Sequence, residues 1–197
     1  MQGSVFHRFD REHLPCMPWR NGGGVTREIA CYPARADIQS FEWRMSIAEV
    51  VRDGPFSDFS GIDRVITLLS GKGLRLVSQQ GDRGGTNHLL DEPFRPFDFS
   101  GDLPITAELL DGPCQDFNVM TRRGVCAAQV SVCRGSDQLG PAPAGVLMSL
   151  LGTWHLNTEV LAPGQGLWWA DRPASWALST QASGAVLLAA LIHPVRP

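Results

Sequence analysis

The sequence predicts an all-β protein built from two jelly-roll barrels packed together, and three observations indicate it. Polar and apolar residues alternate with a period of two in FEWRMSIAEV (41–50), as expected of a half-buried strand. The 197 residues include 21 glycines and 14 prolines at short intervals, which supply the turns of an antiparallel barrel. An apolar strand, a glycine turn, a second strand and a proline-led aromatic segment occur twice, starting at residues 65 and 146.

The same alternation predicts the individual strands. GVTREIA (24–30) is expected to form one strand, and RVITLLSGKGLRLV (64–77) two strands that pair as a hairpin around the Ser-Gly-Lys-Gly turn. DFNVMTRRGVCAAQVSV (116–132) adds one or two more strands. A short helix is expected at most near 57–63 or at the N-terminus.

Domain boundaries are expected around RGSDQLGPAPAG (134–145), because its Gly, Pro and Ser content is typical of a linker. Residues 1–133 would then form a first cupin-like barrel that carries the candidate site. Residues 146–197 would form a second, smaller barrel portion.

Charge and composition argue against several classes of partner. A net charge of −3 does not favour nucleic-acid binding, and GAVLLAALI (184–192) is far shorter than the ~20 apolar residues of a membrane helix. The first residues lack the basic and apolar regions of a secretory signal, so we expect a cytoplasmic protein. Five cysteines without a CxxC pair do not indicate a disulfide framework or a thiolate zinc site.

No metal and no other cofactor is expected. A metal-binding jelly roll requires two histidines two residues apart, a nearby glutamate and a later histidine, whereas the five histidines here are isolated from one another. Motifs for a nucleophile elbow, a P-loop or a dinucleotide-binding loop are also missing.

Three long motifs resemble the HutD/Ves family of bacterial proteins: WRNGGGVTREIA (19–30), FEWRMSIAEVVRDGPFSDFSGIDRVITLLSGKGLRL (41–76) and DFNVMTRRG (116–124). The resemblance implies a double cupin without the metal ligands, and no catalytic activity is established for the family. The triple glycine at 22–24 is closer to the HutD branch, which is associated with histidine-degradation genes and implicated in moderating that pathway by binding an intermediate. The resemblance to the Ves branch implies a link to a cold-related response.

A ligand site is expected where the polar faces of the strands meet. Sixteen of the seventeen basic residues are arginine, and a guanidinium group can bind a carboxylate through two hydrogen bonds. Arg44 and Ser46 share one face of their strand, and Asn118, Met120 and Arg122 share a face of theirs. The predicted ligand-binding residues are Trp19, Arg20, Asn21, Arg27, Glu28, Arg44, Ser46, Phe56, Arg64, Asn118, Met120 and Arg122, with Trp43 as a further aromatic wall.

Structural explanations for these residues stay open at this point. Arg27 and Glu28 are compatible with cross-strand ion pairs, and Asn21 with a turn residue before the glycines. Arg44 or Arg64, if buried, needs a compensating charge, for which Asp53, Asp63 and Asp98 are candidates. Trp168 and Trp169 are expected to fill the core of the second barrel or the seam between the barrels.

Two functions follow from this site. The favoured hypothesis is a non-catalytic protein that regulates histidine utilisation by binding an anionic intermediate: urocanate, formiminoglutamate or formylglutamate. Arg44, Arg64 and Arg122 would anchor the anion, with Ser46 and Asn118 orienting it. The alternative is a metal-independent isomerase or hydrolase that acts on a small carboxylate, with Glu28 as the general base. The expected partner is a small anionic metabolite, not nucleic acid or membrane, and a homodimer is possible through sheet edges.

Overall fold

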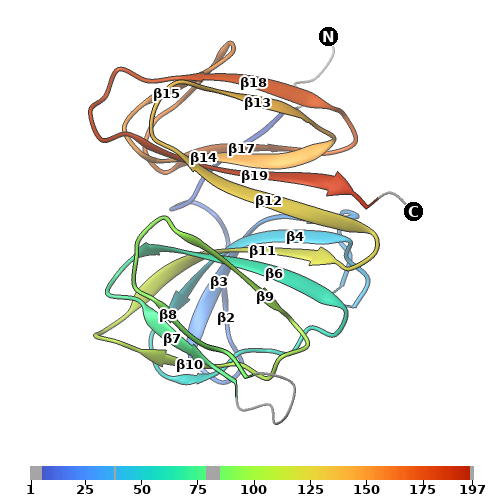
Figure 1. Cartoon of the computed structure of the whole chain (residues 1–197), viewed down its shortest axis with the longest axis vertical. Coiled ribbons are helices and arrows are strands. Elements are labelled where there is room, and N and C mark those ends of the chain that lie inside the picture. The colour runs from blue at the N-terminus through green and yellow to red at the C-terminus, as the bar shows by residue number, and fades with distance from the viewer. Residues whose placement is uncertain (1–5, 38, 79–84, 196–197) are drawn as a thin grey trace. The chain divides into compact units, whose positions relative to one another are not determined.

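The computed structural model describes residues 6–37, 39–78 and 85–195, and these residues form strands, turns and loops (Figure 1). None of the described residues is helical, so this part of the chain has no helix long and apolar enough to cross a membrane. The helix expected near 57–63 is an irregular segment that leads into a strand starting at Ile62. The all-β prediction is confirmed, and no helix forms at 57–63; the alternative position at the N-terminus includes residues 1–5, which lie outside the described residues.

The chain forms two units, which we call the central barrel (Pro15–Val125) and the terminal barrel (Met1–Leu14 with Cys126–Pro197). The strands of the central barrel are β2 (Cys16–Pro18), β3 (Gly24–Tyr32), β4 (Trp43–Val50), β5 (Gly54–Pro55), β6 (Ile62–Ser70), β7 (Leu74–Val77), β8 (Asn87–Leu90), β9 (Pro96–Ser100), β10 (Thr106–Leu109) and β11 (Cys114–Arg122). Those of the terminal barrel are β1 (His7–Asp10), β12 (Cys126–Cys133), β13 (Asp137–Ala142), β14 (Ala144–Leu151), β15 (Trp154–Leu156), β16 (Glu159–Leu161), β17 (Gln165–Trp169), β18 (Ala174–Ser179) and β19 (Val186–Pro194).

These boundaries differ from the expected division into 1–133, a linker at 134–145, and 146–197. Strand β12 pairs with β19 from Cys126 to Cys133, and β1 pairs with β17, so both belong to the terminal barrel. The expected linker contains β13, which pairs with β18. Glycine and proline in this segment accompany a register shift between Leu139 and Ala142 rather than a break between domains.

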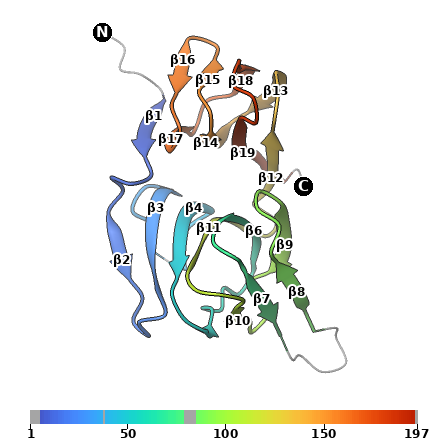
Figure 2. The same cartoon turned by 90° about the vertical axis from the view of Figure 1, so that its left-hand side faces the viewer.

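The two barrels share one topology. In the central barrel, β9-β6-β11-β4 form four adjacent strands of one sheet, and β5-β10-β7-β8 form the other sheet. In the terminal barrel, β17-β14-β19-β12 and β13-β18-β15-β16 repeat both orders, strand for strand. The central barrel adds β3 and β2 beyond β4, whereas the terminal barrel adds β1 beside β17 (Figure 2). The repeated motif in the sequence therefore corresponds to a repeated jelly roll.

The Ser-Gly-Lys-Gly turn does not form the expected hairpin. Strand β6 pairs with β11 and β9, whereas β7 pairs with β10 and β8 in the opposite sheet. The turn carries the chain from one sheet to the other, and Gly71 adopts a φ of 90° there. A period-two pattern identifies each strand but does not indicate which neighbour it pairs with, which explains the wrong prediction.

Each barrel has its own interior. In the terminal barrel it is apolar, with Trp154, Trp169 and Trp176 fully buried among leucines and alanines. The central barrel also has an apolar cluster, which includes Ile66, Leu68, Leu74, Leu76 and Ile105. Polar side chains continue from this cluster along the interior face of the six-stranded sheet of the central barrel. They include the candidate site.

Candidate functional site

The candidate site lies on the interior face of the six-stranded sheet of the central barrel. Along β11, Asn118 is opposite Ser46 on β4 and Ile66 on β6. Two residues further, Met120 is opposite Arg44 and Arg64. Directly opposed residues of neighbouring strands point to the same side of a sheet, so Arg44, Ser46, Arg64 and Asn118 share this face.

Arg64, Asn118 and Asp116 form a buried chain of hydrogen bonds. The side-chain oxygen of Asn118 accepts from Nη2 of Arg64 at 2.9 Å and from Nε at 3.3 Å. The amide nitrogen of Asn118 donates to Oδ1 of Asp116 at 2.8 Å. Arg64 is 5% exposed and Asp116 is fully buried. A neutral amide therefore lies between the two opposite charges.

Three phenyl rings surround the guanidinium of Arg64. Its central carbon lies 4.8 Å from the ring centre of Phe99 and 5.4 Å from those of Phe56 and Phe59. Rings at these distances attract a cation but cannot accept hydrogen bonds along its N–H edges. Within the described residues, Nη1 of Arg64 donates no hydrogen bond, so a positively charged donor group is left for another acceptor.

Burial alters the pKa of both charged groups. Removal from water raises the pKa of Asp116 to about 6, although the Asn118 hydrogen bond and the Arg64 charge act in the opposite direction. Burial also lowers the pKa of Arg64 to about 10, and the nearby Arg44 charge contributes to that shift. The second carboxylate oxygen of Asp116, Oδ2, is buried and has no hydrogen-bond partner. The site therefore contains two incompletely satisfied ions.

Arg44 and Glu28 form an ion pair beside this chain. Nε of Arg44 donates to a carboxylate oxygen of Glu28 at 2.7 Å. We call Arg64, Asn118, Asp116, Arg44, Glu28 and Ser46 the polar row. The Arg44 side chain is 17% exposed and that of Glu28 is 38% exposed, so this ion pair is the more accessible part of the polar row. Ser46, which is opposite both Glu28 and Asn118, is buried between them on the sheet.

The glycine-rich motif packs Trp19 against the end of β3 that begins at Gly24. Residues 19–23 connect β2 to β3, and the backbone N–H of Gly22 donates to the carbonyl of Trp19. A side chain at Gly24 would collide with the Glu49 carbonyl and come to 3.2 Å from the Trp19 ring. Nε1 of Trp19 donates to Thr26 at 2.8 Å, and the ring meets Phe56 edge-on. The glycines thus have a structural role in this close packing.

Several predicted site residues do not join this group. Arg27 lies on the opposite face of β3 and is 3.7 Å from Glu49. Arg122 donates to the backbone carbonyls of Phe41 and Gln39, at 2.9 Å and 2.6 Å.

The other outlying residues have packing or turn roles. Met120 packs in an apolar cluster with Phe41, Phe59 and Ile62. Arg20 is exposed, and Asn21 accepts a hydrogen bond from the Gly23 N–H within the turn. Trp43 stacks on Tyr32 on the face opposite Arg44.

Sequence reasoning did not identify Asp116, Phe59 or Phe99 as parts of the site. Two of the three candidate counter-charges have other partners: Asp53 accepts from the Leu109 N–H, and Asp63 pairs with Arg123. The third, Asp98, is opposite Val65 and therefore on the other face of the sheet from Arg64. Period-two alternation places Asp116 on the face of Asn118, and this signal could have found it. Of the two tryptophans, Trp169 fills the core of the terminal barrel, whereas Trp168 stacks on His7.

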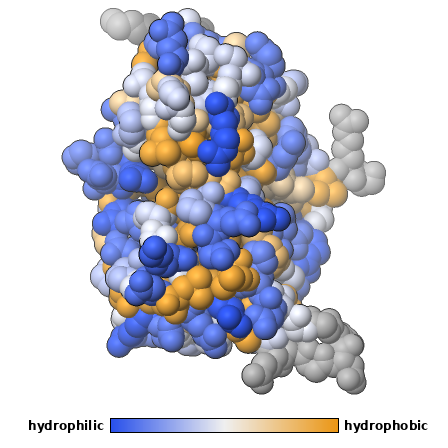
Figure 3. All heavy atoms as spheres, turned by 60° about the vertical axis from the view of Figure 1, so that its left-hand side comes forward, coloured by the Kyte–Doolittle hydropathy of each residue, from blue (hydrophilic) through white to orange (hydrophobic). Residues whose placement is uncertain are grey.

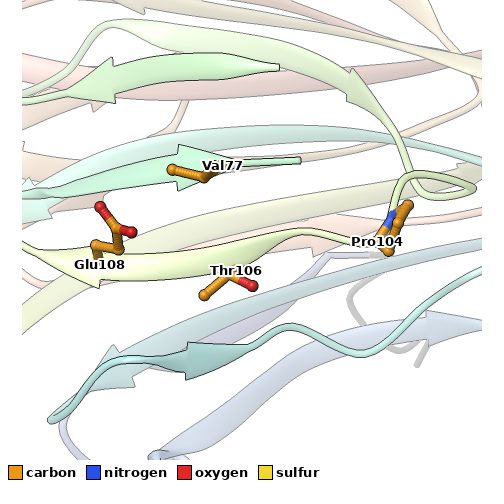
Figure 4. A pocket seen from close by; sticks show the side chains of 4 residues that line it. All are labelled: Val77, Pro104, Thr106 and Glu108. Atoms are coloured by element: carbon orange, nitrogen blue, oxygen red, sulfur yellow. The ribbon is translucent and has the colours of Figure 1, made fainter. Parts of the chain in front are cut away.

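Other surface features are less suited to an anion. A depression of about 370 Å³ on β7 and β10 is lined by Val77, Pro104, Thr106 and Glu108, whose carboxylate would repel an anion (Figure 4). On the face in Figure 3, apolar patches are separated by hydrophilic residues. No group of three or more His, Cys, Asp or Glu side chains among the described residues is arranged to hold a metal ion.

Comparisons with known proteins identify the family. Protein Ves of Cronobacter sakazakii is 41% identical over 186 residues, which cover 94% of this chain and 98% of that protein. The structure of HutD from Pseudomonas fluorescens SBW25 has a TM-score of 0.80 and 26% identity, covering 97% of this chain and all of that one.

A more distant structure shows the fold alone. Oxalate decarboxylase from Lactobacillus farciminis has a TM-score of 0.66 at 8% identity, covering 95% of this chain and 86% of that one. It supports the assignment to the double-cupin fold.

The HutD family model matches residues 11–188, and this chain therefore belongs to the HutD family.

Proposed function

We propose that this protein binds a small carboxylate at Arg64 and acts as a binding protein rather than as an enzyme. One observation carries the proposal: a buried guanidinium has a neutral amide as its hydrogen-bond partner and retains N–H groups without an acceptor. A charged donor group without an acceptor from the protein is suited to a carboxylate, which would bind it through charge-assisted hydrogen bonds.

The polar row around Arg64 favours a ligand with a second polar group. Arg44, Glu28 and Ser46 lie on the same face and offer both donors and acceptors beyond the carboxylate position. The family name links these proteins to histidine utilisation, so urocanate, formiminoglutamate and formylglutamate are the ligands to test first. The assignment to the HutD branch stays a prediction, and the 41% identity to a Ves protein adds a reason to test binding directly.

Isothermal titration calorimetry with these three compounds and glutamate would test the proposal, with product analysis of each mixture afterwards. We expect saturable binding of at least one compound, which is recovered unchanged. Arg64→Met should weaken that binding by about 30-fold or more, because it removes the charged hydrogen bonds but keeps an apolar stem.

Arg27→Met is the matched control, since Arg27 lies on the opposite face of the same sheet. It should bind with wild-type affinity. Equal affinities of wild type and Arg64→Met, or the absence of binding by all four compounds, would refute the carboxylate site.

The enzymatic alternative is less favoured by the geometry of Glu28. Its carboxylate already accepts a hydrogen bond from Nε of Arg44 at 2.7 Å, so it would have to leave this ion pair to take a proton from a substrate. Turnover of any compound in the product analysis, abolished by Glu28→Gln, would reverse this preference.

A further inference from the structure

Asp116 is the most deeply buried charged group beside Arg64, and its surroundings are apolar. Its ladder neighbours are Ala48 on β4 and Leu68 on β6. Leu68 belongs to the apolar cluster that includes Leu74 and Leu76 of the facing sheet. One carboxylate oxygen bonds to Asn118, and the other has no hydrogen-bond partner.

Few other titratable groups among the described residues face Asp116. On the facing sheet, His88 of β8 lies opposite Leu76 and stacks on Phe97, and burial lowers the pKa of its imidazole. Cys114 lies two residues earlier on β11, and burial together with the Asp116 charge raises the pKa of its thiol to about 12, so it remains neutral near pH 6. From β6, Arg64 acts through Asn118. The Arg44 charge on β4 is already balanced by Glu28. Arg64 is therefore the counter-charge that keeps Asp116 ionised.

We propose that Asp116 takes up a proton from solvent when an anion binds at Arg64, so that the carboxylate and the anion alternate as counter-charge of one guanidinium. This inference rests on the proposed function, because it requires an anion at Arg64. It adds Asp116 to the site as a positioning residue that sets the affinity without contacting the ligand.

The physical reason is the cost of a second negative charge in the barrel interior. Arg64 is a single positive charge, and an anion at Nη1 would leave Asp116 and the ligand competing for it. Protonation of Asp116 removes the competition, and its unpartnered oxygen is available to carry the proton. The pKa of Asp116 is already raised to about 6, so the exchange falls near neutral pH.

The expected pH dependence has a definite sign. An anion that binds better to the protonated form must raise the pKa of Asp116, and its affinity must fall as pH rises through about 6. If binding raises that pKa by about one unit, affinity should fall about eightfold between pH 5 and pH 8, and each bound anion should take up about half a proton at pH 6.5.

Calorimetry in buffers with different ionisation enthalpies would measure this proton uptake. N-formylglutamate is the probe, with formate as a second one, because their carboxyl groups are ionised at pH 6.5 and contribute no protons. For wild type, the apparent binding enthalpy should increase with the buffer ionisation enthalpy. For Asp116→Asn, the slope should be zero, and affinity at pH 8 should be about tenfold higher than for wild type.

Each outcome has a distinct meaning. Binding without proton exchange by wild type would overturn the role of Asp116 but leave the anion site intact. If neither probe binds, the same buffer series is run with urocanate, formiminoglutamate and glutamate, and the absence of binding by all of them would overturn the proposed function, and this inference with it. If Asp116→Asn does not fold, ¹³C NMR titration of the wild-type Asp116 carboxyl group with and without N-formylglutamate decides instead, and an unchanged titration midpoint would refute the proposal.

Discussion

The central and terminal barrels share a topology but differ in what their interiors contain. The two barrels can be aligned on an irregularity in strand pairing that both contain. The register between β6 and β11 shifts beside Asp116, and the register between β14 and β19 shifts beside Leu187. When the paired residues are counted from this shift, Leu187 of the terminal barrel corresponds to Asp116 of the central barrel, and Ala189 corresponds to Asn118. Every polar member of the hydrogen-bonded chain thus has an apolar counterpart.

The counterpart of Arg64 is Gly145. Arg64 is opposite Phe99 on β9, and Gly145 is opposite Trp169 on β17. A side chain at Gly145 would lie 2.7 Å from the Trp169 ring, so the indole occupies the space that a larger residue would need. Nε1 of Trp169 is satisfied by the Ala142 carbonyl at 2.9 Å. One barrel fills this position with a ring, and the other holds a charge there, which indicates that the charge is not needed for the fold.

The largest expected effect comes from breaking the polar chain. Asn118→Ala, which copies the terminal barrel, would leave Arg64 and Asp116 without their shared partner. We expect the free energy of unfolding in urea to fall by about 3 kcal/mol, as for other broken buried charge networks. Asn87→Ala, on an exposed part of β8, should change it little. A loss below about 0.5 kcal/mol for Asn118→Ala would mean that the chain contributes little to stability.

The next effect is the pH dependence of stability. The pKa of Asp116 is raised by burial to about 6 when the protein is folded, so the unfolded chain loses this proton first as pH rises. Stability should therefore decline between about pH 4 and pH 6, by up to about 3 kcal/mol, and level off above. Asp116→Asn should remove this decline. Parallel pH profiles of the melting temperatures of wild type and variant would contradict it.

A smaller effect is expected from filling the space at Gly145 in the terminal barrel. Gly145→Ala would bring a methyl group to 2.6 Å from the Ala190 carbonyl as well as against Trp169. Overpacking of this kind costs about 1 to 3 kcal/mol, measurable as a lower melting temperature. Gly140→Ala is the control, because a side chain there meets nothing within 4 Å. Unchanged melting of Gly145→Ala would show that the indole can move aside.

The smallest effect concerns charges at the surface of the central barrel. Arg123 pairs with Asp63 at 2.7 Å and with Asp102 at 2.8 Å, but all three side chains are about half exposed. Arg123→Ala should lower the free energy of unfolding by less than about 1 kcal/mol, with the difference shrinking further at high salt. A loss as large as that of Asn118→Ala would contradict the contrast between buried and exposed charges.

The sequence by itself determined the all-β class, the repeat and most strands, because alternation and turn residues are local signals. It also determined which residues share a face, as for Glu28 with Thr26 and for Arg44 with Ser46. The triple glycine was visible, but its role in packing Trp19 was not, since that depends on the approach of β4.

Only the tertiary structure decided how the sheets and charges are paired. The sequence did not show that β6 and β7 separate into opposite sheets, or that β12 joins the terminal barrel, because strand partners are distant in the chain. Nor did it show which acid balances Arg64: Asp116 lies 52 positions away and acts through Asn118. Local patterns fix the side on which a residue lies, whereas the counter-charge of a buried ion depends on which strands are brought together.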